Sequence, residues 1–178
     1  ITLVNNFMEL ARSGTSLEEE TRPSPFSLAD LLEGLLRTLR PLADEKGLRL
    51  EVQNTVAGPD RRMGYPVSLS RVLLNLGTNA IKFTEEGRVL VRASEPAPGL
   101  VEIQVVDTGP GMSPAQARSL EEVFEPSATG SGIHFSGSGL GLVIVRKLLR
   151  RMGSELQVES ETGSGTRAAF TLPLAGAG

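Results

Sequence analysis

The chain has 178 residues, 39% of them hydrophobic, which predicts one domain with a sizeable core. The net charge of −3 gives no electrostatic footprint for nucleic acid, and the absence of cysteine from the sequence excludes disulfides, thiolate metal sites and cysteine nucleophiles. The sequence contains no run of eighteen apolar residues that would predict a membrane span, and no signal peptide is visible.

Residues 1–14 form an amphipathic helical pattern, with apolar side chains at spacings of three and four. An isolated helix of this length is marginally stable in water, so we expect it to have a partner. Because the pattern is already under way at Ile1, we expect the chain to be part of a longer protein. Residues 15–24 are polar, acidic and proline-bearing, which predicts a linker.

Hydrophobic periodicity divides the rest of the chain into helices and strands. Helices are predicted at 28–46, 69–83, 114–122 and 140–152. Strands are predicted at 48–53, around 62–63, and at 88–94, 100–106, 155–160 and 167–172. Ser27 is the expected N-cap of the first of these helices, and Pro41 is expected to kink or interrupt it. The last helix is apolar nearly all round, and we expect it to be buried. This order of elements favours an α+β fold, a two-layer α/β sandwich with helices on one face of a mixed, mostly antiparallel sheet.

The helix predicted at 69–83 carries two stripes of side chains. The expected core stripe contains Leu69, Val72, Leu73, Leu76, Ala80 and Phe83. Asn75, Asn79 and Lys82 share a second stripe along its edge, because offsets of four and three keep side chains on one face. A buried amide without a partner costs about 1–3 kcal/mol. An anion with a hard metal ion would satisfy this stripe, since an amide oxygen can ligate magnesium and an ammonium can meet phosphate. The alternative is that Asn75 hydrogen-bonds across a helix interface and that Lys82 is solvated.

Two glycine-rich motifs follow downstream. In Asp107-Thr-Gly109-Pro-Gly111-Met112 a carboxylate at a strand end can accept from an amine such as that of adenine, and the glycines let the backbone approach a flat base. Residues 137–142, Gly-Ser-Gly-Leu-Gly-Leu, run into a helix whose N-terminus favours an anion, as in a phosphate cradle. Neither a dinucleotide fingerprint nor a P-loop fits this second motif. The alternatives are an ordinary turn after a strand and a loop that serves only flexibility.

Together these motifs resemble the ATP-binding catalytic module of sensor histidine kinases, in the superfamily shared with gyrase, Hsp90 and MutL (GHKL). The resemblance runs from about Pro25 to Pro173. Five motifs carry it, in chain order. Residues 75–84 resemble the N box, 107–112 the first glycine box, 123–126 the F box and 137–142 the second glycine box. Residues 163–166, together with the strand at 167–172, resemble the family's closing segment. Residues 1–14 resemble the end of the dimerisation and histidine-phosphotransfer helix. The resemblance therefore implies a catalytic domain at 25–173 and a short tail at 174–178.

The resemblance also implies a role for each site residue. Asn79 would ligate Mg²⁺ with the help of Asn75, Lys82 would contact phosphate, and Phe83 would pack near adenine. Asp107 would accept the adenine amine in a pocket shaped by Gly109 and Gly111 and supported by Thr166. The phosphates would be held at the second glycine box by Gly137, Ser138, Gly139, Leu140, Gly141 and Leu142. Residues 125–138 would form a lid, and His134, the one histidine in the sequence, is expected to be a lid residue.

The implied cofactors are ATP and Mg²⁺, and the implied reaction is transfer of the γ-phosphoryl group to a histidine on an upstream domain, for relay to a response regulator. The resemblance further implies a homodimeric parent protein, a cytoplasmic location with any membrane anchor outside this chain, and no contact of the chain with nucleic acid or membrane. The sequence has no Lys or Arg between Phe124 and Arg146, where the family's lids usually carry a basic residue. A non-catalytic nucleotide-binding sensor or docking module of the same fold is therefore the alternative.

Two other activities known on this fold fit less well. A hydrolase like gyrase or Hsp90 would carry a glutamate as the base for water at the position of Asn75, and an amide is no base. The helical pattern of residues 1–14 argues against a serine kinase of the anti-sigma type.

Overall fold

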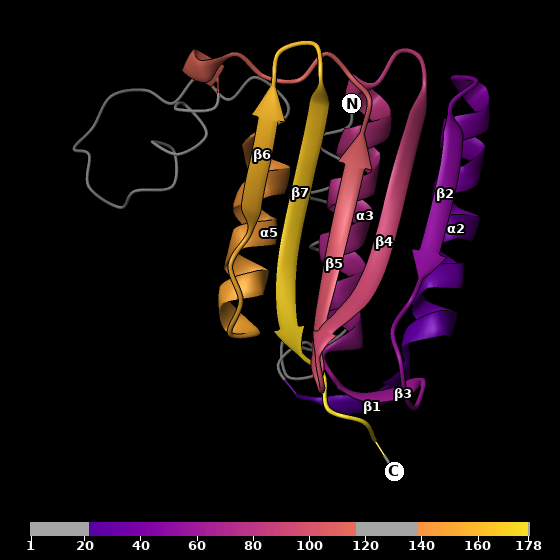
Figure 1. Ribbon diagram of the computed structural model, residues 1–178, viewed down its shortest axis with the longest axis vertical. Coiled ribbons are helices and arrows are strands. Elements are labelled where there is room, and N and C mark those ends of the chain that lie inside the picture. The colour runs from indigo at the N-terminus through magenta and orange to yellow at the C-terminus, as the bar shows by residue number, and fades with distance from the viewer. Residues whose placement is uncertain (1–21, 117–138, 178) are drawn as a thin grey trace.

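The computed structural model describes residues 22–116 and 139–177. Three helices cover one face of a five-stranded sheet, and a two-stranded sheet closes one end (Figure 1). The elements are β1 (Ser24–Ser27), α2 (Leu28–Glu45), β2 (Arg49–Asn54), β3 (Arg61–Gly64), α3 (Pro66–Phe83), β4 (Arg88–Ala97), β5 (Leu100–Asp107), α5 (Gly139–Arg151), β6 (Gln157–Glu161) and β7 (Gly165–Pro173). This is the predicted two-layer α/β sandwich.

The five-stranded sheet has the order β2-β4-β5-β7-β6. Only the β2–β4 pair is parallel among the described strands, so the sheet is mixed and mostly antiparallel, as predicted. Alternate residues of β4, β5 and β7 point toward the helices and form an aliphatic core with α2, α3 and α5. Val89, Val91, Ile103 and Phe170 are almost completely buried there.

The helix α2 begins as predicted at its N-cap. The Ser27 Oγ accepts the Asp30 backbone N–H at 2.9 Å. Of the two effects predicted for Pro41, a kink or an interruption, the interruption does not occur, because the helix runs unbroken to Glu45. Pro41 lies on the exposed face, where water can hydrogen-bond the Arg37 carbonyl that loses its helical partner.

The helix α3 begins earlier than predicted, because Pro66 occupies its first turn, where a missing N–H costs little. The apolar stripe of this helix is buried as expected, with Leu69, Val72 and Leu73 at 0% exposure. The assignment of Phe83 to the core is wrong, since its side chain is 46% exposed. Phe83 is the last residue of the helix, and its ring lies under the Lys82 ammonium instead of against the sheet.

The helix α5 is buried on one face only, which corrects the expectation of a helix buried all round. Val145 and Leu149 are fully buried against the core, whereas Lys147, Arg150 and Arg151 are exposed. Among the residues that the structure describes, no helix is both long enough and apolar enough to cross a membrane.

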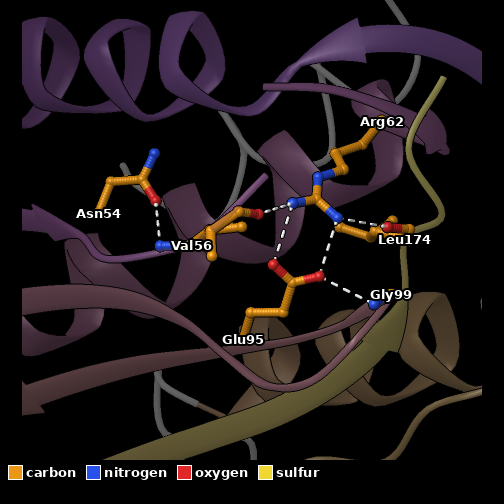
Figure 2. A network of polar contacts seen from close by, with 7 residues as sticks. Asn54, Val56, Arg62, Glu95, Gly99 and Leu174 are labelled. Carbon is orange, nitrogen blue, oxygen red and sulfur yellow. Dashed lines mark hydrogen bonds and ion pairs between the residues drawn. The ribbon is translucent and has the colours of Figure 1, made fainter. Parts of the chain in front are cut away.

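A buried ion pair ties together the end of the molecule that carries β1 and β3. The Arg62 guanidinium contacts both carboxylate oxygens of Glu95, at 3.1 and 3.2 Å, where the β4–β5 register shifts (Figure 2). Arg62 also donates to the carbonyls of Ala57 at 2.6 Å and Leu174 at 3.1 Å. The Gly99 N–H donates to Glu95 at 2.8 Å. One side chain therefore joins β3, the β4–β5 hairpin and the segment after β7.

Residues 174–177, expected to form a tail, pair with β3. The Met63 N–H donates to the Ala175 carbonyl at 2.9 Å, and the Ala177 N–H donates to the Arg61 carbonyl at 2.8 Å. β1 pairs with the other side of β3. The strand β3 thus lies between β1 and the segment after β7 and is paired with both.

Candidate functional site

The predicted site residues gather at the opposite end of the sheet from β1 and β3. The last turn of α3, the end of β5, the first turn of α5 and the β6–β7 hairpin all lie at this end (Figure 1). Segments that are about sixty residues apart in the sequence meet there, because α3 and α5 pack side by side and β5 pairs with β7.

Asp107 is the last residue of β5, and its carboxylate is held by the backbone. Its Oδ1 accepts the Gly109 N–H at 2.9 Å and the Thr166 N–H at 3.2 Å. Both of these donors converge on Oδ1, which leaves Oδ2 to accept a hydrogen bond from a ligand. Burial raises the pKa of the Asp107 carboxyl, while the two backbone N–H groups partly oppose this rise. The group is therefore a preorganised acceptor in a partly desolvated place.

Glycines allow the turn after Asp107 to pack closely on the β6–β7 hairpin. Gly111 has φ +67°, and a Cβ there would collide with the Glu161 carbonyl. Gly165 has φ +88°, and a Cβ there would collide with the Asp107 carbonyl. These positions require glycine both for their backbone conformation and for their close approach.

Hydrogen bonds fasten this turn to the same hairpin. The Ser160 Oγ accepts the Met112 N–H at 2.9 Å, and the Gly163 N–H donates to the Pro110 carbonyl at 2.7 Å. The hydroxyls of Ser160 and Thr166 lie 2.8 Å apart. Thr166 thus supports Asp107 through its backbone and reaches Ser160 through its side chain. The sequence analysis did not single out Ser160, because a serine in an alternating strand carries no local sign of such a contact.

The amide stripe of α3 faces the first turn of α5. The Asn75 Nδ2 donates to the Arg71 carbonyl at 2.9 Å, which turns the amide oxygen away from the helix axis. A Cβ at Gly141 would stand 3.3 Å from the Asn75 Oδ1 and 3.6 Å from the Asn79 amide nitrogen. The missing side chain at Gly141 therefore leaves room beside both amides. The structure thus brings the amides of α3 next to Gly141 of the second glycine-rich motif, and both motifs were predicted to bind phosphate and its metal ion.

Lys82 and Phe83 lie together at the exposed end of α3. The Lys82 Nζ stands 5.3 Å from the centroid of the Phe83 ring, within the range of a cation–π contact. Both side chains are exposed, so they are free to meet an anion and a flat apolar ring system, respectively.

The donor set fits Mg²⁺ held mainly by a ligand. The described residues contain no group of three or more His, Cys, Asp or Glu side chains that could hold a metal ion. Mg²⁺ commonly takes one or two protein oxygens together with substrate phosphates and water. Asn75 and Asn79 each carry one amide oxygen that suits that role, and the Asn75 Oδ1 lies beside Gly141.

Part of the predicted site lies outside the described residues. This applies to Gly137, Ser138, His134, the segment 123–126 and the expected lid at 125–138. Of Gly139 and Leu140 the structure describes the helical backbone only. Leu142 is partly buried and packs against the core, so its side chain serves the fold.

The fold and the site together define a class: a two-layer α/β module whose polar motifs converge at one end of its sheet. A family model described as "Histidine kinase-, DNA gyrase B-, and HSP90-like ATPase" matches residues 64–176. The chain belongs to this family, and the membership predicted from its five motifs is confirmed.

Three comparisons show which relatives the chain is similar to. It is 33% identical over 181 aligned positions to the autoinducer 2 sensor kinase/phosphatase LuxQ of Vibrio cholerae serotype O1, covering 98% of this chain and 20% of that protein. It is 38% identical over 154 positions to the sensor histidine kinase GacS of Pseudomonas protegens, covering 84% of this chain and 17% of that protein. The crystal structure of full-length ShkA in complex with AMPPNP matches with a TM-score of 0.77 and 34% identity, covering 99% of this chain and 36% of that one. The chain thus spans no more than a fifth of the length of these two curated relatives.

Proposed function

We propose that this chain is the catalytic ATP-binding part of a sensor histidine kinase. In this proposal it binds ATP with Mg²⁺ and presents the γ-phosphoryl group to a histidine on an upstream domain, from which the group passes to a response regulator. The parent protein would be a homodimer, and the reaction would take place in the cytoplasm. The family membership and the relatives named as sensor kinases support this proposal.

The observation that carries the proposal is the placement of Asp107 relative to the amide stripe. An acceptor carboxylate with one free oxygen suits the exocyclic amine of adenine. Asn75, Asn79 and Lys82 belong to the same end of the molecule and suit a metal-chelated triphosphate. In this proposal, one end of the sheet would supply both halves of a nucleotide site.

Each side chain would have a binding or orienting role. Asp107 would hold the adenine amine, Phe83 would cover the base, and Lys82 would neutralise phosphate charge. Asn79 and Asn75 would hold Mg²⁺, which would neutralise phosphate charge. Phosphoryl transfer needs positioning and charge neutralisation more than covalent help from the protein, so this set suffices for the role.

Calorimetric titration and a phosphotransfer assay test the proposal together. The chain should bind ATP in the presence of Mg²⁺ and more weakly in EDTA. When the parent's histidine-bearing hairpin domain is added with labelled ATP, that domain should acquire phosphate that is labile to acid and stable to base. ATP binding without any such phosphate would favour the non-catalytic sensor module. Absence of ATP binding would contradict both functions.

A further inference from the structure

Lys46, at the C-terminal end of α2, caps a different helix. Its Nζ donates to the carbonyl oxygens of Ile81 and Lys82, at 3.0 Å each. These carbonyls belong to the last turn of α3, where the oxygens have no partner within their own helix. Lys46 follows α2 directly, and its cationic head reaches 35 residues along the chain to do this.

This contact has an electrostatic consequence for the end of α3. The aligned peptide dipoles give a helix C-terminus roughly half a negative charge. An ammonium group bonded to two terminal carbonyls cancels much of that charge within the last turn. Lys82 and Phe83, the residues that would meet phosphate and base, are the last two residues of the same turn. A polyanion that approaches Lys82 would otherwise face the negative end of the helix.

The ion pair of Lys46 is a minor part of the arrangement. Its Nζ lies 3.6 Å from a Glu85 carboxylate oxygen, but the Glu85 side chain is 83% exposed. An exposed pair of this kind is screened by solvent and contributes little. The Lys46 side chain is only 29% exposed, so its two bonds to carbonyl oxygens are the better protected contacts.

We propose that Lys46 is a positioning residue for the phosphate end of the nucleotide site. Its hydrogen bonds fix the last turn of α3, which carries Lys82. Its positive charge cancels the partial negative charge that the carbonyl groups of this turn would present to a triphosphate. This inference rests on the proposed function, and it gives the C-cap residue of α2 a part in nucleotide affinity.

Three variants of the full chain separate this role from a structural one. K46M removes the charge and both hydrogen bonds while keeping the length of the side chain. K46R keeps a charged donor at the same place, and E85Q removes the ion pair alone. The affinities for Mg-ATP and for adenosine are measured by calorimetry at a temperature where thermal melting shows each variant to be folded.

We expect K46M to bind Mg-ATP about fivefold more weakly, the scale of one charge at a helix terminus, with a smaller change for uncharged adenosine. Added salt should reduce the difference in ATP affinity between K46M and the unchanged chain, because salt screens the charge of Lys46 in the unchanged chain. K46R should recover most of the ATP affinity, and E85Q should stay within twofold of the unchanged chain.

Two results would overturn the inference while leaving the proposed function intact. One is a K46M chain with the original ATP affinity and a lower melting temperature, which would make Lys46 a purely structural cap. The other is an equal loss for adenosine and ATP, which would exclude an effect on the phosphates. If the unchanged chain binds no ATP, the proposed function fails and this inference fails with it.

Discussion

At the scale of single residues, the ionised form of Asp107 has opposite effects on the stability of the fold and on ligand binding. Burial raises the pKa of its carboxyl above the ordinary value of 3.8. Between 3.8 and the raised pKa the folded chain holds more protons than the unfolded chain, so the free energy of unfolding falls as pH rises through this window. Above this pH window the buried, ionised carboxylate lowers the free energy of unfolding. The ionised form is nevertheless the stronger hydrogen-bond acceptor for an amine.

D107N should therefore move stability and binding in opposite directions. The amide oxygen can still accept the Gly109 and Thr166 N–H groups, but the buried charge is gone. We expect thermal melting at pH 7 to give a stability equal to or above that of the unchanged chain, without the fall in stability that Asp107 contributes as pH rises through its raised pKa. ATP affinity should fall by about 1–3 kcal/mol, the scale of one charged hydrogen bond. A matched titration with GTP is the control, and an equal loss for both nucleotides would mean that Asp107 does not read the base.

Asn79 should matter for binding only when metal is present. N79A removes one amide oxygen from the proposed metal site on α3, and alanine favours the helix. Calorimetry should therefore show Mg²⁺-dependent ATP binding abolished, with circular dichroism unchanged. L74A, on the same helix, removes apolar packing against the core instead of an amide, so it serves as the control for a loss of stability in α3. An unchanged affinity of N79A for Mg-ATP would refute the metal role.

At the scale of elements, the β6–β7 hairpin acts as a clamp on the turn after β5. The hairpin is hydrogen-bonded to Met112 and Pro110. It also packs closely against the Asp107 backbone at Gly165, where there is no side chain in the way. The position of Asp107 therefore depends on a strand pair that starts about fifty residues later in the chain. Changes in this hairpin should alter the adenine side of the site without touching the nucleotide.

G165A and G163A form a matched pair for this clamp. Both glycines have positive φ, so alanine costs about 1–2 kcal/mol at either one. A Cβ at Gly163 meets nothing within 4 Å, whereas one at Gly165 collides with the Asp107 backbone. Denaturant melts should show a larger loss for G165A, about 3 kcal/mol or more, and calorimetry should show weaker ATP binding for G165A alone. Equal losses of stability for the two variants would contradict the clamp.

The elements themselves were largely predictable from periodicity and capping. The N-cap at Ser27, the buried stripe of α3 and the β-rich runs of β4 and β5 are local patterns, and the structure has them. Phe83 was misplaced because periodicity tells which face of a helix a residue occupies, but not where the helix passes the end of its sheet. The contacts of Lys46 and Ser160 could not be predicted, since they join residues far apart in the chain and no local pattern records them.

At the scale of the whole molecule, stability and the candidate site are anchored at opposite ends. Arg62 is 2% exposed and joins three segments near β1 and β3 (Figure 2). Asp107 and the amide stripe lie toward the other end of the sheet. Its partner Glu95 has a lowered carboxyl pKa, first through the hydrogen bonds with Arg62 and then through the Gly99 N–H. The stability that this carboxylate contributes is present above its ordinary pKa and is lost as pH falls through the lowered one.

R62M should lower the stability of the chain without weakening the nucleotide site. The change removes hydrogen bonds to two carbonyls and leaves the Glu95 carboxylate without its guanidinium. Urea melts should show a loss of about 3 kcal/mol at pH 7 for removing this buried arginine, and a smaller loss in acid. In conditions where R62M is folded, its affinity for Mg-ATP should match that of the unchanged chain. A large loss of affinity in the folded variant would show that the two ends are coupled.

The pairing of β3 with both β1 and the segment after β7 has one more consequence. The chain enters the module at Ser24 and leaves it after Ala175, and these two segments pair with opposite sides of the short strand β3. Both junctions of the module therefore lie at the end of the sheet opposite the candidate site, so a neighbouring module joined to either of them would leave the candidate site unobstructed. A circular permutant that links these junctions through a few glycines, reopened at Gly58, would need no rearrangement of the sandwich.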